Sequence, residues 1–166
     1  RSEGFYDLDR YIESVNTVND ALGILSALYY PSSMTVLNND MRYSVYSSRE
    51  IFRALDDTEE NIFLDLYKDH ILPSIVEFSP TSTSQIIPGL TLAKLIKDRN
   101  KDIHVTVGGS VFTKLIENVK KVEGLFSIVD SFVVFEGEHA LLGLVEQVGG
   151  KRDFAKVPNL VYREDD

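Results

Sequence analysis

The sequence predicts an α/β fold whose sheet is mostly parallel, and two observations lead to this prediction. Residues 74–78 and 103–107 are rich in the β-branched and aromatic side chains typical of strands. Between these two runs, apolar residues recur at helical spacing and can pack one helix face on a sheet: Leu90, Leu92, Ala93, Leu95 and Ile96. Strand, helix and strand in this order form a crossover unit with two parallel strands.

The chain before this unit is expected to be mainly helical. Residues 5–28 carry apolar side chains every three or four positions, which predicts a helix with a break near residues 16–19. Pro31 ends this run, because a proline biases the residue before it away from helix. Residues 34–37 are a short strand candidate, closed by a turn at residues 38–40.

Two further helices are expected before the crossover unit. Ser48 is expected to cap a helix that runs through Leu55, with Glu50 in its first turn. Thr58 is expected to open the next helix, which Pro73 ends.

After the crossover unit, helices and strands continue to alternate. The pattern predicts a helix at residues 111–119, a strand at 132–135, a helix at 140–148 and a last strand at 157–163. Gly149 and Gly150 are expected to stop the third of these elements in the manner of a C′ glycine. The alternation is typical of a Rossmann-like (flavodoxin-like), doubly wound sheet with flanking helices.

The domain prediction follows from this order of elements. Residues 1–70 are expected to form an N-terminal helical portion with one short strand within the same domain, and residues 71–166 its βαβαβαβ core. Doubly wound domains usually begin with a strand that becomes central. Either a first strand precedes Arg1, or the sheet is smaller than usual.

Composition narrows the range of partners. The 166 residues carry 17 Lys and Arg against 26 Asp and Glu, a formal net charge of −9 that repels nucleic acids and anionic membrane surfaces. No signal peptide or membrane span is evident, so a cytoplasmic protein is expected. The absence of cysteine excludes thiol nucleophiles and cysteine-bound metal clusters from this polypeptide.

Candidate binding residues cluster where predicted strands end, which is where ligands bind in doubly wound sheets. They are Ser79, Thr81, Ser82, Gln85, Gly108, Gly109, Ser110, Glu136 and Gly137. Structural alternatives stay open: Ser84 can merely cap the following helix, and the two glycines can form only a tight connection. No spacing of a catalytic triad or a metal site is found in the sequence, so the chain itself is not expected to be catalytic.

Four sequence elements resemble a known family. They are residues 85–97, residues 103–110, the turn Glu136-Gly137-Glu138 before a leucine-rich helix, and residues 157–163. In this order they resemble the cobalamin-binding-like domain in front of the catalytic barrel of many radical S-adenosylmethionine (radical SAM) enzymes. The resemblance implies an accessory domain whose partner is its own radical SAM catalytic domain, expected downstream, which would hold the 4Fe-4S cluster and S-adenosylmethionine.

The resemblance also implies a place for cobalamin, whose nucleotide tail would lie between Ser79 and the Gly108-Gly109 pair. The family's cobalt-binding histidine has no counterpart here, because His104 lies inside a predicted strand. Cobalamin would therefore bind base-off, with no histidine on the cobalt. Two residues differ from the family pattern. Thr81 replaces a leucine, and Phe135 replaces the glycine that begins the family's Gly-Glu-Gly-Glu turn.

Two alternatives to cobalamin binding stay open. One is a degenerate domain that has lost the cofactor and serves as a docking or substrate-positioning module, which Phe135 and the missing histidine favour. The other is an α/β enzyme that acts on a phosphorylated small molecule through the Ser/Thr-rich loop at residues 79–85.

Overall fold

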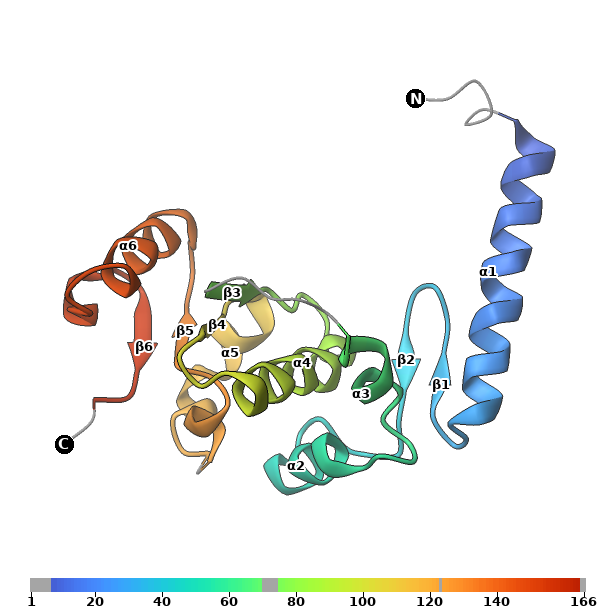
Figure 1. Ribbon diagram of the computed structural model, residues 1–166, viewed down its shortest axis with the longest axis horizontal. Coiled ribbons are helices and arrows are strands. Elements are labelled where there is room, and N and C mark those ends of the chain that lie inside the picture. Colours follow the sequence, from blue (N-terminus) through green and yellow to red (C-terminus); the bar gives the residue numbers. More distant parts are fainter. Residues whose placement is uncertain (1–6, 70–74, 123, 165–166) are drawn as a thin grey trace. The chain divides into compact units, whose positions relative to one another are not determined.

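The structure is a computed structural model that describes residues 7–69, 75–122 and 124–164 (Figure 1). The chain divides into two compact units, Arg1–Ile62 and Phe63–Asp166, which are described separately below. Among the described helices, none combines the length and the apolar character that crossing a membrane requires.

The first unit begins with a long helix, α1 (Leu8–Leu28). Its N-terminus is capped by Asp7, whose carboxylate accepts hydrogen bonds from the backbone N–H groups of Asp9 and Arg10 at 3.1 and 3.3 Å. The break expected near residues 16–19 is wrong, since α1 continues through them. These residues include no glycine or proline, so nothing in the backbone interrupts the helix.

A β-hairpin follows α1. Strand β1 (Ser33–Met34) pairs antiparallel with β2 (Asn39–Asp40), and the N–H of Thr35 donates to the carbonyl oxygen of Asn38 at 2.8 Å. The turn therefore precedes Asn39, and the predictions of a strand at residues 34–37 and a turn at 38–40 are shifted. The hairpin forms a two-stranded sheet separate from the main one.

Helix α2 (Ser48–Asp56) forms as predicted but is capped by Ser47 rather than Ser48. The next helix, α3 (Ile62–Tyr67), starts later than the predicted Thr58. The reason is Asp57, whose carboxylate accepts the N–H groups of Glu59 and Glu60 at 2.9 Å each and holds them in a turn.

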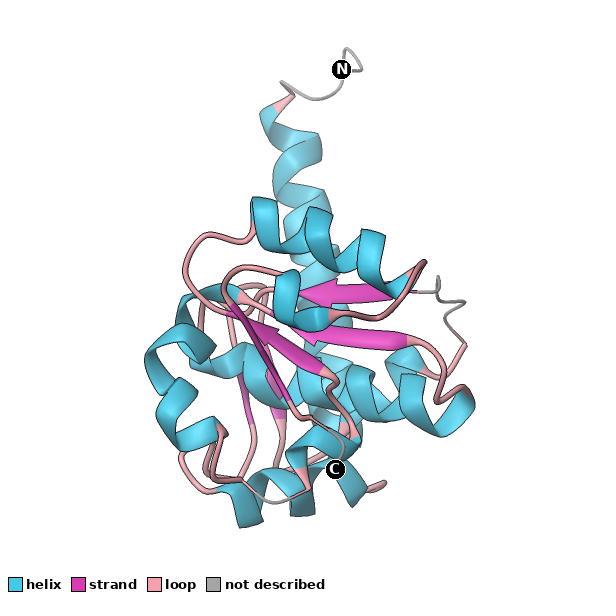
Figure 2. Ribbon diagram, turned by 90° about the vertical axis from the view of Figure 1, so that its left-hand side faces the viewer, coloured by secondary structure: helices cyan, strands magenta, loops and turns pink. Residues whose placement is uncertain are grey.

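The second unit contains the main sheet, and the fold class predicted from the sequence is confirmed. Strands β3 (Ile75–Phe78), β4 (His104–Val107), β5 (Ser131–Val133) and β6 (Leu160–Tyr162) lie side by side in chain order. The first three are parallel. Helices α4 (Ile86–Arg99), α5 (Gly109–Val119) and α6 (Glu138–Val148) connect and flank the strands in a Rossmann-like α/β arrangement (Figure 2).

The last strand runs antiparallel to β5, which departs from a purely parallel core. Asn159 has a left-handed φ of 56°, and its carbonyl oxygen accepts the N–H of Val134 at 2.9 Å. This contact starts β6 beside the end of β5, so the strand returns in the opposite direction. Strand β6 also starts at Leu160, three residues after its predicted start at residue 157.

The glycines after α6 do not adopt the expected left-handed C′ conformation. Gly149 is the C-cap with φ of −76°. The left-handed φ, 56°, occurs instead at Arg152, whose N–H donates to the carbonyl oxygen of Gln147 at 3.0 Å. The helix thus ends at Val148 as predicted, whereas the left-handed residue comes three positions after Gly149.

The core of the second unit lies between the sheet and its helices. Of the predicted helix face, Leu90, Ala93 and Ile96 are buried, whereas Leu92 and Leu95 are only half-buried. The side chains that complete this core include Val105, Val107, Val111, Phe112, Val119, Leu125, Ile128, Val129, Phe132, Val133, Ala140, Leu144 and Val157.

An ion pair in this core joins α4 to the sheet. Lys97 is buried, and its Nζ lies 2.6 Å from Oδ2 of Asp130 and donates to the carbonyl oxygens of Lys101 and Ile103 at 3.0 and 2.7 Å. The same carboxylate accepts the N–H of Val105 at 2.7 Å. Lys97 and Asp130 therefore fix the end of α4 against the entry to β4 and β5.

Candidate functional site

A cavity of about 330 Å³ opens where the three parallel strands end. Its lining residues come from the ends of β3, β4 and β5, from the turns that follow them, and from α6: Glu77, Ser79, Gly108, Gly109, Val133, Phe135, Gly137, Glu138 and Leu141. We call it the carboxyl-end cavity. Its position is the one at which α/β sheets bind ligands.

Two glycines let the loops after β3 and β4 approach each other closely at this cavity. A Cβ on Gly109, whose φ is +84°, would lie 2.5 Å from the carbonyl oxygen of Pro80. A Cβ on Gly108 would lie 3.1 Å from both Oε1 of Glu77 and Oγ of Ser79. Position 109 therefore requires glycine, because its φ is left-handed and a side chain would collide with Pro80. At position 108, the absence of a side chain lets Glu77 and Ser79 lie close to the backbone.

The polar edge of the cavity is formed by Glu77 and Ser79. The Ser79 hydroxyl donates a hydrogen bond to Oε1 of Glu77, and both side chains are exposed. Glu138 adds a second carboxylate from α6. The cavity lining thus includes one hydroxyl group and two carboxylates, and Ser79 and Glu77 lie next to Gly108.

Two helices begin at the cavity without a side-chain cap. Gly108 is the N-cap of α5 and Gly137 the N-cap of α6, and neither helix start receives a hydrogen bond from a capping side chain. The N–H groups of a first helical turn have no partner within the helix. They offer hydrogen bonds and a positive dipole end to a polar or anionic ligand group.

Phe135 occupies an unusual backbone conformation beside this wall. Its φ is 63°, which is uncommon for a residue other than glycine and costs about 1 to 2 kcal/mol. Its side chain lines the cavity yet is 76% exposed, and its N–H donates to Oγ1 of Thr113 at 3.2 Å. The ring therefore contacts whatever enters the cavity while burying little surface itself.

The structure brings together four of the nine residues predicted from the sequence: Ser79, Gly108, Gly109 and Gly137 all line the carboxyl-end cavity. Ser110 is exposed in the first turn of α5 and does not line it. Glu136 is exposed, and its carbonyl oxygen accepts a hydrogen bond from Nδ2 of Asn159 at 3.2 Å.

The three remaining candidates form a local cap rather than part of the cavity wall. Ser82 and Gln85 make a capping box, in which Oε1 of Gln85 accepts the N–H groups of Thr81 and Ser82 at 2.8 and 3.1 Å. Ser84, the alternative cap, donates its N–H to Oγ of Ser82 at 3.4 Å. The polar loop after β3 therefore serves mainly to start α4.

Sequence reasoning missed Glu77, Val133 and Leu141 as lining residues. Glu77 could have been found, because a glutamate within an otherwise apolar strand is unusual. Val133 and Leu141 carry no such signal, since apolar residues at these positions are equally compatible with the core.

The described histidines lie outside the cavity lining. His104 is buried at the start of β4, where its Nε2 lies 2.9 Å from Oγ of Ser131 and its ring packs on Phe154. Burial lowers the pKa of His104 below its ordinary value, and the nearby Asp130 carboxylate partly opposes this shift. His139 is exposed in the first turn of α6, and His70 lies outside the described residues.

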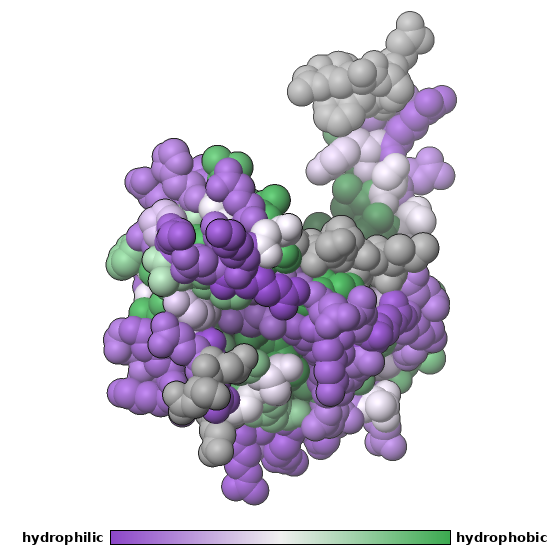
Figure 3. Space-filling model, turned by 60° about the vertical axis from the view of Figure 1, so that its left-hand side comes forward, coloured by the Kyte–Doolittle hydropathy of each residue, from purple (hydrophilic) through white to green (hydrophobic). Residues whose placement is uncertain are grey.

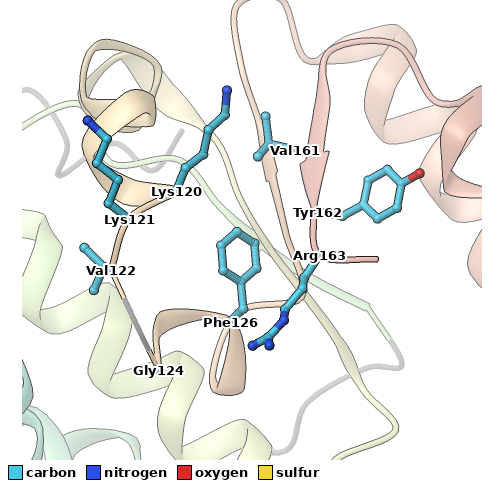
Figure 4. A pocket seen from close by; sticks show the side chains of 8 residues that line it. All are labelled: Lys120, Lys121, Val122, Gly124, Phe126, Val161, Tyr162 and Arg163. Carbon is cyan, nitrogen blue, oxygen red and sulfur yellow. The ribbon is translucent and has the colours of Figure 1, made fainter. Parts of the chain in front are cut away.

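A second cavity, of about 450 Å³, is lined by the segment between α5 and β5 and by the carboxyl end of the antiparallel strand β6 (Figure 4). It is lined by Lys120, Lys121, Val122, Gly124, Phe126, Val161, Tyr162 and Arg163. The ammonium groups of Lys120 and Lys121 point away from Phe126 at its centre, so the cations do not converge (Figure 4). Within the described ranges, no group of three or more histidine and acidic side chains could hold a metal ion.

Comparisons of the chain with models of protein families, with curated proteins and with solved structures give no match. The choice between binding and other functions therefore depends on the geometry of the carboxyl-end cavity. That geometry combines a glycine-lined wall, a serine hydroxyl group and two uncapped helix starts.

Proposed function

We propose that the chain is a cofactor-binding accessory domain that takes the nucleotide tail of cobalamin into the carboxyl-end cavity. The observation that carries the proposal is the approach of Gly108 and Gly109 to Ser79 at the strand ends. The space in front of Gly108 is filled by the Glu77 and Ser79 side chains, which are both exposed, so a planar base can reach the backbone there once these two side chains move aside. The cavity volume, about 330 Å³, falls within the range of about 300 to 1,000 Å³ typical of small-molecule sites.

The polar groups around the wall suit the sugar and phosphate of the tail. Ser79 can exchange its hydrogen bond with Glu77 for one to the ligand, because both side chains are exposed. The free N–H groups at the starts of α5 and α6 can donate to phosphate oxygens. Glu77 and Glu138 repel a phosphate placed next to them, so the base rather than the phosphate is expected at their edge.

Cobalamin would bind base-off and without a histidine ligand from the described residues, since His104 is enclosed by the core and His139 does not line the cavity. The chain's own residues would bind and orient the cofactor. The cobalt chemistry would take place against a separate radical SAM catalytic domain with its 4Fe-4S cluster and S-adenosylmethionine, a partner proposed from the sequence resemblance alone.

The proposal predicts that binding depends on the nucleotide tail. The protein is dialysed against hydroxocobalamin and, in parallel, against cobinamide, which has the same corrin ring but no tail. We expect retention of about one cobalamin per chain and at least tenfold weaker binding of cobinamide, a difference of about 1.4 kcal/mol or more. Equal retention of the two corrinoids, or of neither by the folded protein, contradicts the proposal.

A second candidate function is a docking or substrate-positioning module without cofactor, and Phe135 favours it. The phenyl ring lines the cavity and lies next to the position where the tail would enter. If the ring excludes the tail, the wild-type protein retains no cobalamin but binds its catalytic domain. The effect of removing this ring, described in the Discussion, separates the two functions.

A further inference from the structure

Helix α1 exposes an unusually large number of apolar side chains. It has 21 residues, none of which is buried. Leu8 is 67% exposed, Tyr11 63% and Val18 49%. Apolar side chains are visible on the helix below the grey N-terminal residues in Figure 3. In proteins most of the stability of a helix comes from packing its apolar face on a partner.

Six apolar residues of α1 follow a heptad repeat, while Ile12, Ile24 and Leu28 lie outside its a and d positions. Counting from Leu8, steps of three and four residues alternate without exception through the a and d positions: Leu8, Tyr11, Val15, Val18, Leu22 and Leu25. An alternating three-four spacing averages about 3.5 residues and keeps one seam facing a partner helix along its whole length. A helix that packs on a globular core instead follows its 3.6-residue period and a broader, less regular face.

The charged residues of α1 all lie away from this seam. Asp9, Arg10, Glu13 and Asp20 occupy the b, c and f positions. The e and g positions, which flank the seam, are uncharged: Ile12, Asn19 and Ser26 at e, and Ser14, Ala21 and Leu28 at g. Charges at e and g select partners in coiled coils. Two identical copies of α1 therefore meet without repulsion, and no charge pattern specifies a different partner.

Half of the seam residues are exposed, namely Leu8, Tyr11 and Val18, whereas Val15, Leu22 and Leu25 are half-buried. Oγ of Ser26, at an e position of the last heptad, accepts the N–H of Met34 in β1 at 2.9 Å. This contact lies at the C-terminal end of α1, where Leu22 and Leu25 are half-buried. The first two heptads, from Leu8 to Val18, carry the most exposed seam residues.

We propose that α1 pairs with α1 of a second copy of this chain in a two-stranded coiled coil. The helix is about 31 Å long and about 10 Å wide, which gives a contact face of roughly 300 Å² per copy. This face is smaller than the roughly 800 Å² per partner of a standard stable interface, so a weak dimer with a dissociation constant in the micromolar range is expected. The inference is independent of what the carboxyl-end cavity binds.

The test is the mass of the chain in sedimentation equilibrium from about 5 to about 500 µM, a range that spans the expected dissociation constant. We expect the wild type to change from one to two chains per particle over this range. Helicity measured by circular dichroism should rise in parallel, because pairing stabilises α1. Val18→Lys, at a d position, should weaken the dimer at least tenfold, since it places two lysines at the seam.

Thr17→Lys is the matched control. It adds the same charge one residue away, at an exposed c position, and should leave the dimer unchanged. A wild type that stays monomeric at the highest concentration overturns the proposal, because another partner then covers the seam. An equal effect of the two lysine substitutions overturns it as well, because the loss would then follow net charge rather than position.

Discussion

Replacing Asp130 by alanine should lower the free energy of unfolding by about 2 to 4 kcal/mol, because it breaks a largely buried ion pair. The substitution leaves the buried ammonium group of Lys97 without its carboxylate and the N–H of Val105 without its acceptor. Lys97 keeps two carbonyl acceptors, and Asp130 is 32% exposed, so the loss falls short of a fully buried pair. Urea denaturation followed by circular dichroism measures the change.

Asp98→Ala provides the control for this prediction. Asp98 also pairs with a lysine of α4, Lys94, at 2.9 Å, but it is 59% exposed. Surface pairs of this kind contribute about 0.3 to 0.5 kcal/mol. Equal losses for Asp130→Ala and Asp98→Ala would show that the Lys97 pair does not hold α4 against the sheet.

Replacing Phe135 by glycine should raise the affinity for hydroxocobalamin at least tenfold. The substitution removes the ring from the wall of the carboxyl-end cavity, beside Gly108 and Gly109. It also relieves the left-handed φ of 63°, which glycine adopts without the cost of a Cβ. Because the ring is 76% exposed, its removal gives up little buried surface. Equilibrium dialysis at several cobalamin concentrations measures the affinity.

Phe135→Ala separates the effect of removing the ring from the effect of relieving the backbone strain. Both variants lack the ring, so both should bind cobalamin more tightly than the wild type. Only the glycine variant relieves the strain, and it should be more stable than the alanine variant by about 1 kcal/mol. Unchanged affinity in both variants would mean that the ring does not compete with the ligand, whereas weaker binding would mean that it stacks on the base.

The crossover unit could be predicted from the sequence because its signals are local and agree with one another. Strand-forming runs around Val76 and Val105 and the helical spacing of Leu90 and Ile96 all indicate one βαβ unit, which the structure confirms. Element ends were less predictable, because several residues compete for each cap. Ser47 rather than Ser48 caps α2.

One local turn and one tertiary contact account for two other differences in the fold. Asp57 holds the N–H groups of Glu59 and Glu60 in a turn and delays α3. The antiparallel direction of β6 depends on the carbonyl group of Asn159 and the N–H of Val134, which are 25 residues apart in the chain. No periodicity in a single sequence encodes such a contact.

For the candidate site, the sequence indicated the glycine wall but not the whole cavity. Ser79, Gly108 and Gly109 were predicted because polar and glycine residues directly follow two strands, and parallel strands end at one edge. Thr81, Ser82 and Gln85 follow the same strand, but their polar groups bond to one another in a helix cap. Spacing alone does not distinguish a ligand loop from a capping box.

The most direct test of cobalamin binding in the carboxyl-end cavity is an ¹H–¹⁵N correlation spectrum recorded with and without hydroxocobalamin. Glycine amides are resolved from most others, so Gly108, Gly109 and Gly137 report on the cavity wall, and Gly23 in α1 serves as an internal reference. We predict that the first three resonances shift in proportion to bound cobalamin while that of Gly23 stays in place. Bound cobalamin that leaves the three cavity glycines unshifted would contradict the account.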